Sequence, residues 1–362
     1  MKVLHIETGR FFYGGPQQVL YICSGLKLKG IENILVCQPN SALSDMARSE
    51  GIRVIDLSCK GDLDLLFAFR LWRIMHKEKP DIVHSHSRRG ADFLAGYVTK
   101  FSAIPSVISR RVDSIEPKLL SKLRYRLFKK VIVISKKIFN ILDDVGIDQK
   151  KLVLIPSAID VKRFEKFSDK ALFIKEFNIK EDDFVIASVG QLIERKGHIH
   201  LIEIMPSLIQ RYPNIRLMIF GQGKLEQLLR KRCSELDLNK NITFLGFRSD
   251  LDNYMPHFKL LVHPATKEGL GVSLLKASAS GVPIVGFKTG GVPEIVQDGE
   301  TGLLANLTDR EMLQKHIAYF IDNEEYRMDC AARAKKWVTN EFPLEEMISK
   351  HIKLYESIYH VE

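Results

Sequence analysis

The sequence predicts an α/β protein of two domains, each built around a parallel β-sheet. Apolar segments of strand length alternate with segments of helical period along most of the chain, which is typical of parallel sheets covered by helices. The alternation restarts after a polar stretch at 161–183, which we interpret as the interdomain connection, and 362 residues exceed one ordinary domain. We therefore place the domains at 1–163 and 164–342, and we expect a final helix over 343–362 to pack back onto the first domain.

The first domain opens with a strand over 1–8, a glycine-rich turn and a helix over 17–28. The turn lacks the spacing G-x-G-x-x-G, so the dinucleotide-binding fingerprint is absent. Gly14 and Gly15 either let backbone approach a ligand closely or form a tight turn without a ligand. The other strands of this domain are expected over 33–38, 53–57, 81–85, 106–109, 131–135 and 152–157.

Two patterns in the first domain could bind a metal ion. Asp62 and Asp64 resemble the D-x-D pair that holds manganese in one class of sugar transferase, but Asp64 better suits the N-cap of a helix over 64–78. His84 and His86 share a face at the end of a strand, where ligands of parallel sheets gather. They could be a metal pair or packed histidines. Because no further clustered ligands are evident, we expect no metal and favour His86 as a hydrogen-bonding partner of a substrate.

The second domain repeats the architecture. Its strands are expected over 184–189, 215–220, 242–245, 260–263, 283–287 and 302–305, with a helix over 198–211 and another from 224. The strand that ends near 263 leads into a carboxylate, Glu268, then Gly269 and Gly271, and a helix that begins near Val272. These glycines and the unpaired amides of the helix could cradle a phosphate, while Glu268 accepts hydrogen bonds from hydroxyl groups. A nucleotide-activated sugar would satisfy both halves, although an ordinary strand-to-helix turn has the same pattern.

Arg195 and Lys196 follow the first strand of the second domain, where two cations could neutralise a diphosphate and stabilise it as a leaving group. The alternative is an exposed basic pair on a loop. Glycine-rich turns also follow two further strands, at Gly221 and at 290–294, and the second of them could present its backbone amides to a phosphate.

The net charge of +10 favours an anionic partner, and the charge concentrates at 110–137, where ten cationic residues stand against two acidic ones. Interleaved leucines make this segment resemble a basic amphipathic helix suited to an anionic membrane surface, or a merely solvated basic face. Nucleic acid is disfavoured because no recognition fold accompanies the charge. Five scattered cysteines and the lack of a secretory or membrane-spanning segment predict a reducing, cytoplasmic setting.

Together these motifs resemble the family 4 glycosyltransferases. The most specific match is the stretch 264–285 joined to 290–294, with the basic pair at 195–196 and the histidine pair at 84–86. The resemblance implies the GT-B fold, two facing Rossmann-like domains with a cleft between them. It also implies transfer of a sugar from a nucleoside diphosphate sugar, with retention of anomeric configuration and no required metal or other cofactor.

The resemblance also implies roles for individual residues. Lys196, with Arg195, would hold the diphosphate, Glu268 would hold the donor sugar's hydroxyls, and His86 would lie near that sugar. Backbone at five positions would meet sugar or phosphate: Gly14, Gly15, Leu270, Gly271 and Val272. Three further residues complete the expected donor-binding set: Gln191, Gly221 and Lys276.

Two positions depart from the family pattern. The glutamate that usually binds the ribose hydroxyls is Lys276, which donates hydrogen bonds and cannot accept them, and an arginine often found near the diphosphate is Gln191. Lys276 could turn toward phosphate, or the ribose could be held differently. The sequence thus predicts a cytoplasmic enzyme peripheral to the membrane, acting on a lipid-linked or envelope glycan such as lipopolysaccharide. The alternatives are a nucleotide-sugar epimerase and a non-catalytic partner subunit that binds sugar nucleotides.

Overall fold

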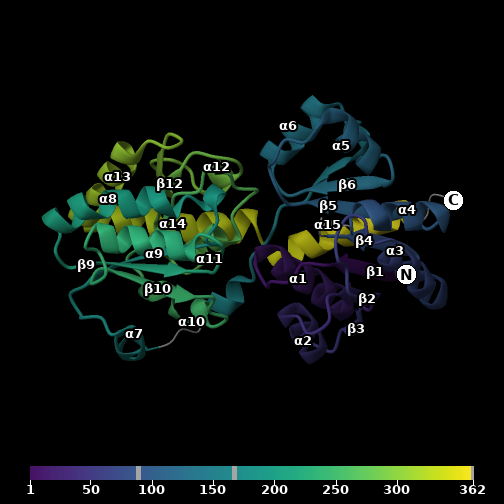
Figure 1. Cartoon of the computed structure of the whole chain (residues 1–362), viewed down its shortest axis with the longest axis horizontal. Helices are drawn as coiled ribbons and strands as arrows, with labels where there is room; N and C mark the ends of the chain where they lie inside the picture. The colour runs from purple at the N-terminus through teal and green to yellow at the C-terminus, as the bar shows by residue number, and fades with distance from the viewer. Residues whose placement is uncertain (87–90, 165–168, 360–362) are drawn as a thin grey trace. The chain divides into compact units, whose positions relative to one another are not determined.

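The computed structural model describes residues 1–86, 91–164 and 169–359, and the chain divides into two compact units (Figure 1). Unit 1 comprises Met1–Ala158 and Leu344–Glu362, and unit 2 comprises Ile159–Pro343. The chain therefore leaves unit 1 after Ala158 and returns to it after Pro343. Each unit is an α/β fold on its own parallel sheet, as the alternation of apolar segments predicts.

Unit 1 is built on a seven-stranded sheet in the order β3-β2-β1-β4-β5-β6-β7. Its strands are β1 (Lys2–Glu7), β2 (Glu32–Cys37), β3 (Arg53–Asp56), β4 (Ile82–Ser85), β5 (Ser106–Arg110), β6 (Lys130–Val133) and β7 (Leu152–Leu154). All pairings are parallel, and the strand order reverses direction between β1 and β4. The register of this pair places His5 opposite His84. Such a reversal is the topological switch point, where ligands of open α/β sheets bind.

The helices of unit 1 cover this sheet and include the last helix of the chain. They are α1 (Gly14–Leu28), α2 (Ala42–Ser49), α3 (Leu65–Glu78), α4 (Phe93–Phe101), α5 (Lys118–Tyr125), α6 (Lys136–Val145) and α15 (Leu344–Tyr359). Asp64 is the N-cap of α3, as predicted, and its side chain accepts a hydrogen bond from the Phe67 amide. α15, yellow in Figure 1, packs against α1, and Tyr355 lies in one core with Tyr21. The final three residues of the expected helix over 343–362 lie outside the described residues.

Unit 2 is built on a six-stranded parallel sheet in the order β10-β9-β8-β11-β12-β13. Its strands are β8 (Phe184–Val189), β9 (Ile215–Phe220), β10 (Ile242–Gly246), β11 (Leu260–His263), β12 (Ile284–Phe287) and β13 (Gly302–Ala305). The central strands are almost wholly apolar because helices bury both faces of the sheet. The switch point of this sheet lies between β8 and β11, which pair directly.

The helices of unit 2 connect these strands in crossovers. They are α7 (Lys170–Phe177), α8 (His198–Arg211), α9 (Glu226–Glu235), α10 (Leu251–Tyr254), α11 (Val272–Ala279), α12 (Val292–Ile295), α13 (Arg310–Asp322) and α14 (Glu324–Glu341). Four short 3₁₀ helices complete the described elements, η1 (Gln149–Lys151) in unit 1 and η2 (Val161–Phe164), η3 (Glu194–Lys196) and η4 (Met255–His257) in unit 2.

The interpretation of 161–183 as the interdomain connection is wrong, because unit 2 already begins at Ile159. Its described residues include η2 and α7, and they bury Phe164 and Phe173. The Phe173 ring packs against the Phe258 ring edge-on, at a centroid distance of 5.3 Å. This segment therefore belongs to the core of unit 2, and its polar composition reflects the exposed face of a short helix.

The expectation of a basic amphipathic helix over 110–137 is also wrong. The segment contains the end of β5, the eight-residue helix α5, β6 and the start of α6. The buried run at β6 continues the sheet, and two of the expected surface cations are buried. Arg110 and Arg124 both form ion pairs with Glu116, and Arg124 also pairs with Asp92 at 3.1 Å. None of the described helices is long and apolar enough to cross a membrane.

Candidate active site

The switch point of unit 2 brings two predicted residues together. Lys196 ends η3, which follows β8, and Glu268 lies in the loop that follows β11. The two loops meet because Gly197 has a φ of +66°, and a Cβ atom there would lie 1.9 Å from the carbonyl oxygen of Pro264. Only glycine allows this approach. The Thr266 amide also donates a hydrogen bond to the carbonyl oxygen of Arg195, at 2.9 Å.

Glu268 is the centre of a buried polar group. Its carboxylate oxygen Oε2 forms an ion pair with the ammonium of Lys196. The same oxygen accepts a hydrogen bond of 2.9 Å from Nε2 of His263, the last residue of β11. Only 7% of Glu268 is exposed to solvent. The strand ends therefore hold a carboxylate and an ammonium in a nearly dry site, where charges interact more strongly than in water.

The ionisation of this group follows from its partners. Burial alone would raise the pKa of Glu268, but Lys196 and the hydrogen bond from His263 outweigh burial and lower it. Burial lowers the pKa of His263, against the opposing effect of Glu268. Glu268 is thus a carboxylate at neutral pH, and His263 is a neutral donor. Burial, with smaller effects of Lys196 and His263, lowers the pKa of the nearby His198 to about 3.

The glycine-rich turn after Glu268 prepares a helix N-terminus. Gly271 is the N-cap of α11 with a φ of +108° and no side-chain cap. The first amides of α11, which begin at Val272, lack partners within the helix and point out of its N-terminus. The Gly291 amide donates a hydrogen bond of 3.0 Å to the carbonyl oxygen of Glu268 and so fixes this turn. Amides near Leu270, Gly271 and Val272 are thus close in sequence and space to the carboxylate, in an arrangement suited to an anion.

The remaining predicted residues of unit 2 make different contacts. Gln191 is half-buried beyond the end of β8. Gly221 has a φ of +140°, and a Cβ atom there would lie 1.8 Å from the carbonyl oxygen of Gly190, so glycine is needed for backbone packing. Lys276 does not turn toward a phosphate site in this structure. Its ammonium forms an ion pair with the carboxylate of Asp252, at 2.9 and 3.0 Å.

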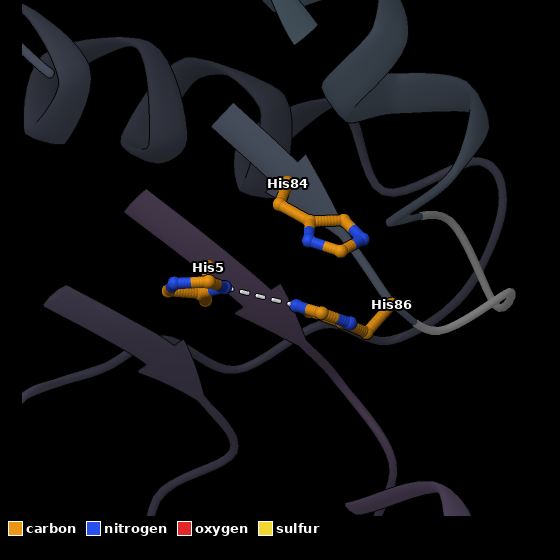
Figure 2. Close-up of side chains that lie close together, drawn as sticks. All are labelled: His5, His84 and His86. Atoms are coloured by element: carbon orange, nitrogen blue, oxygen red, sulfur yellow. Dashed lines mark hydrogen bonds between the residues drawn. The ribbon is translucent and has the colours of Figure 1, made fainter. Parts of the chain in front are cut away.

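The switch point of unit 1 holds a cluster of three buried histidines (Figure 2). His84 lies in β4 and His86 follows it, and their rings lie on one face with centroids 3.7 Å apart, as their spacing predicts. His5 in β1 completes the cluster, with its Nδ1 atom 3.0 Å from Nε2 of His86. The sequence interpretation missed His5 because it is distant in the chain. The signal that could have found it is the pairing of β1 with β4, which is common in doubly wound sheets.

Gly14 and Gly15 begin α1 just beyond β1, and a cation lies beside them. A Cβ atom on Gly15 would lie 3.7 Å from Cδ of Arg111. Burial lowers the pKa of Arg111 to about 10, against the opposing effect of Glu7. Within the described part of the chain, Nε of Arg111 has no hydrogen-bond partner. In the sequence, Arg111 stands out only as one cation of the basic segment 110–137. In the structure it directly follows β5, at the edge of the sheet where ligands gather.

Both units match glycosyltransferase families. Residues 13–163 match the family described as Glycosyltransferase Family 4, and residues 169–337 match the family described as Glycosyl transferases group 1. The chain belongs to the family 4 glycosyltransferases. The match over 169–337 includes the switch point of unit 2, and the match over 13–163 includes β4 of unit 1 and begins after β1.

The relatives of this glycosyltransferase include one named for lipopolysaccharide core biosynthesis and one named for mannosyl transfer. The lipopolysaccharide core biosynthesis glycosyltransferase LpsE of Rhizobium meliloti is 23% identical over 99% of this chain and 99% of its own length. A GDP-mannose-dependent monoacylated phosphatidylinositol monomannoside mannosyltransferase of Corynebacterium glutamicum is 31% identical over 56% of this chain and 55% of its own length.

A solved structure shares the fold of this glycosyltransferase. The Anabaena protein HepE in complex with UDP and glucose has a TM-score of 0.88 and 18% identity, and the match covers 99% of this chain and 100% of HepE. The predicted GT-B fold is confirmed at the level of two parallel-sheet α/β domains.

Proposed function

We propose that this glycosyltransferase moves a sugar from a nucleoside diphosphate sugar to its acceptor with retention of anomeric configuration. The observation that carries the proposal is the buried pair of Lys196 and Glu268 at the switch point of unit 2. The cation can bind the diphosphate, and the carboxylate can accept hydrogen bonds from the hydroxyl groups of the sugar. The two groups lie together at one edge of the sheet, so they match the two ends of a diphosphate sugar. Two similar proteins support a nucleotide donor, since one is named as GDP-mannose-dependent and another was solved with UDP.

In the proposed mechanism, Lys196 and Arg195 hold the diphosphate and stabilise the charge that develops as it leaves. The backbone amides at the N-terminus of α11 add partial positive charge to the same oxygens. These groups supply the cationic environment, so we propose that transfer needs no metal ion. Because the pair is closed in this structure, binding of the donor requires the Lys196 ammonium to exchange part of its contact with Glu268 for phosphate oxygen.

Glu268 takes the other role in this proposal. Its pKa lies below the ordinary value because Lys196 and His263 outweigh the effect of burial, so it presents a carboxylate that accepts hydrogen bonds from sugar hydroxyls. His263 orients that carboxylate from β11. In unit 1, we assign His86 to the neighbourhood of the sugar and the start of α1, at Gly14 and Gly15, to phosphate.

We further propose a lipid-linked or envelope glycan acceptor, with lipopolysaccharide favoured, at the inner face of the cell membrane. Support comes from a pocket of about 340 Å³ in unit 1. Its walls combine apolar and cationic side chains: Leu119, Lys122, Leu123, Tyr125, Arg126, Gly146, Ile147, Asp148 and Lys151. Leu119 in this wall is 73% exposed. An apolar rim with nearby cations suits the phosphates and upper acyl chains of an anionic membrane.

The test of the proposed function is transfer of radiolabel from nucleotide sugars to a lipid extract by the full chain. A thermal-shift panel of nucleoside diphosphates and their sugars first selects the donor by the stabilisation it produces. If the protein is a transferase, it releases free nucleotide from the donor only when acceptor is present. Conversion of the donor sugar without nucleotide release would instead identify an epimerase and overturn the proposal.

A further inference from the structure

We propose that His5 is a positioning residue, which fixes the orientation and the tautomer of the His86 ring and so directs Nδ1 of His86 toward a hydroxyl group of the donor sugar. This inference rests on the proposed function, because it adds a role for His5 to the place given there to His86. Its physical basis is the hydrogen bond between Nδ1 of His5 and Nε2 of His86, at 3.0 Å (Figure 2).

β1 holds His86 through both the backbone and the side chain of that residue. His86 lies just beyond the end of β4, and its amide donates a hydrogen bond of 2.9 Å to the carbonyl oxygen of Ile6. His5, the preceding residue of β1, is bonded to the ring. A side chain held by a strand is placed more precisely than one held by loops alone.

The bond between the two rings also determines where a proton lies. Burial lowers the pKa of both histidines, to about 3 for His5, so both rings are neutral at pH 7. A neutral imidazole has one N–H group, so one of the two bonded nitrogens donates and the other accepts. The tautomer of His5 therefore determines whether Nδ1 of His86 is a donor or an acceptor.

Nδ1 of His86 is the ring nitrogen that is left for a ligand. It is buried and makes no hydrogen bond to the described residues. Buried polar atoms without partners are rare, and a ligand is one explanation for them. A sugar hydroxyl both donates and accepts, so it can bind this nitrogen in either tautomer.

His84 restricts the remaining movement of the His86 ring. The centroids of the two rings are 3.7 Å apart. His84 is hydrogen bonded to the hydroxyl of Tyr355 through Nδ1, at 2.6 Å, and to the hydroxyl of Ser109 through Nε2, at 2.8 Å. A ring that is bonded at both nitrogens cannot turn without breaking a bond. His84 therefore packs against His86 in a fixed position, and His5 sets the direction of the nitrogens.

Packing does not explain a histidine at position 5. Val3, Leu4 and Ile6 in the same strand are buried and apolar, and His5 is fully buried. The bond to His86 is the single hydrogen bond of its side chain to the described residues, because Nε2 has no partner among them. An apolar residue would avoid the cost of that unpaired nitrogen. We therefore expect the His5→Leu protein to fold with at least the thermal stability of the unaltered chain.

The first experiment follows the ring nitrogens of His86 by NMR in the ligand-free full chain, labelled with ¹⁵N-histidine and assigned with His86→Gln. The unaltered chain should show one tautomer of His86, and His5→Leu should produce a mixture of both. His5→Asn should retain the single tautomer, because an asparagine amide can donate or accept from the position of Nδ1. An unchanged His86 spectrum in the His5→Leu protein would overturn the proposal, as would a mixture of tautomers in the unaltered chain.

The second experiment uses calorimetry to compare the affinity for a nucleotide sugar with the affinity for the nucleoside diphosphate alone. His5→Leu should weaken binding of the nucleotide sugar about three- to tenfold, because a hydrogen bond to the sugar loses its orientation. It should leave binding of the nucleoside diphosphate unchanged, and His5→Asn should bind both ligands like the unaltered chain. Equal weakening of both ligands by His5→Leu would indicate a general structural role and contradict the proposal.

His351→Leu is the matched control. It replaces another buried histidine, whose ring centroid lies 5.8 Å from that of His84 and whose Nδ1 is bonded to the carbonyl oxygen of Met347. It should leave the His86 spectrum and both affinities unaltered, and effects equal to those of His5→Leu would overturn the proposal.

The two experiments separate this inference from the proposed function. If His86→Gln leaves the affinity for the nucleotide sugar unchanged while the spectra respond to His5→Leu as expected, the sugar-binding role of His86 fails and its positioning by His5 stands. If His86→Gln weakens binding of the nucleotide sugar and His5→Leu changes neither the spectra nor the affinity, the role of His86 stands and the positioning by His5 is wrong.

Discussion

The ammonium of Lys196 and the carboxylate of Glu268 form an ion pair across 72 positions of sequence. The pair depends on adjacent strands, because β8 and β11 deliver one partner each. It also depends on Gly197, which allows the loop of the cation to pass against the backbone of Pro264. The two side chains are 12% and 9% exposed. A buried pair of this kind controls both the charge of the site and the stability of unit 2.

Replacing Lys196 with alanine should lower the turnover of sugar transfer about 10²- to 10³-fold, because a preorganised positive group at the leaving diphosphate is lost. Steady-state kinetics with the donor selected by thermal shift would measure the change. Lys267→Ala is the matched control, since Lys267 is exposed in the same loop region and should keep nearly full activity. Full activity of the Lys196→Ala protein would remove Lys196 from the proposed role.

The ion pair of Lys196 and Glu268 should also contribute strongly to the stability of unit 2. Lys196→Met leaves the buried carboxylate of Glu268 without its cation and should destabilise unit 2 by about 3 kcal/mol. The double variant Lys196→Met with Glu268→Gln removes both charges and should recover much of that loss while staying inactive. If the loss in the double variant equals the sum of the losses in Lys196→Met and in Glu268→Gln alone, the two residues are not directly coupled.

The positions of the tryptophans make it possible to measure the unfolding of unit 2 separately. The chain has two tryptophans, Trp72 in unit 1 and Trp337 in unit 2. In a Trp72→Phe background, the fluorescence of Trp337 reports the urea unfolding of unit 2 alone.

The stability of unit 2 should fall as the pH falls below 6.5, because His198 is buried as a neutral imidazole. Its pKa is about 3 in the folded chain and 6.5 in the unfolded one, so the unfolded state takes up the proton first. This contribution is complete above pH 6.5 and is lost as the pH falls toward the folded value. At pH 5 the loss of stability amounts to about 2 kcal/mol.

The check is urea unfolding at pH 7 and pH 5, again followed by Trp337. His198→Asn should reduce the difference in the free energy of unfolding between the two pH values by about 2 kcal/mol. His76→Asn, at an exposed position of unit 1, should leave the difference unchanged. An unaltered difference in the His198→Asn protein would show that another group titrates.

Binding to vesicles that contain anionic lipid should depend on three cations of the unit 1 pocket. Each is expected to contribute about 1 kcal/mol near such a surface, so the combined changes Lys122→Gln, Arg126→Gln and Lys151→Gln should weaken co-sedimentation on the order of a hundredfold. The control removes equal charge from unit 2 with Lys231→Gln, Lys335→Gln and Lys336→Gln. Arg124 is not a useful target because it is buried with Glu116 and Asp92. Equal effects of both triple variants would refute a specific membrane surface.

Lys276 should matter little for binding of the donor. Its ion pair with Asp252 is partly exposed, at 20% and 23%, and such a pair is worth at most about 1 kcal/mol. Lys276→Ala and Asp252→Ala should each change kcat/KM less than about tenfold, since 1.4 kcal/mol corresponds to one factor of ten. A large rise of the donor KM in Lys276→Ala alone would instead indicate that the lysine grips the donor.

Elements with a strong local signal could be predicted from the sequence. β8, β9, β11 and β13 have the expected bounds, because strands buried on both faces are continuous apolar runs between turns. The contact of Lys196 with Glu268 follows from the same logic, since both residues come directly after strands of a doubly wound sheet. Edge regions with mixed composition gave weaker signals, and α7 was interpreted as a connection for this reason.

The features that could not be predicted depend on contacts between residues that are distant in the sequence. The cations at 110–137 look alike in sequence, yet Arg124 is buried by two acidic residues and Lys122 is exposed. His5 and His263 stand in apolar strands without a motif, and their importance comes from the residues opposite or after them. Such roles depend on strand register and on the path of loops, which spacing along one chain does not encode.

The return of α15 to unit 1 sets an order for biosynthesis. Tyr355 in this helix is hydrogen bonded to His84 and lies in the core with Tyr21, so the amino-terminal unit lacks part of its interior until α15 is made. Unit 2 is continuous in sequence and is available to fold as soon as it leaves the ribosome. The half of the protein that is synthesised first is therefore the half that is finished last.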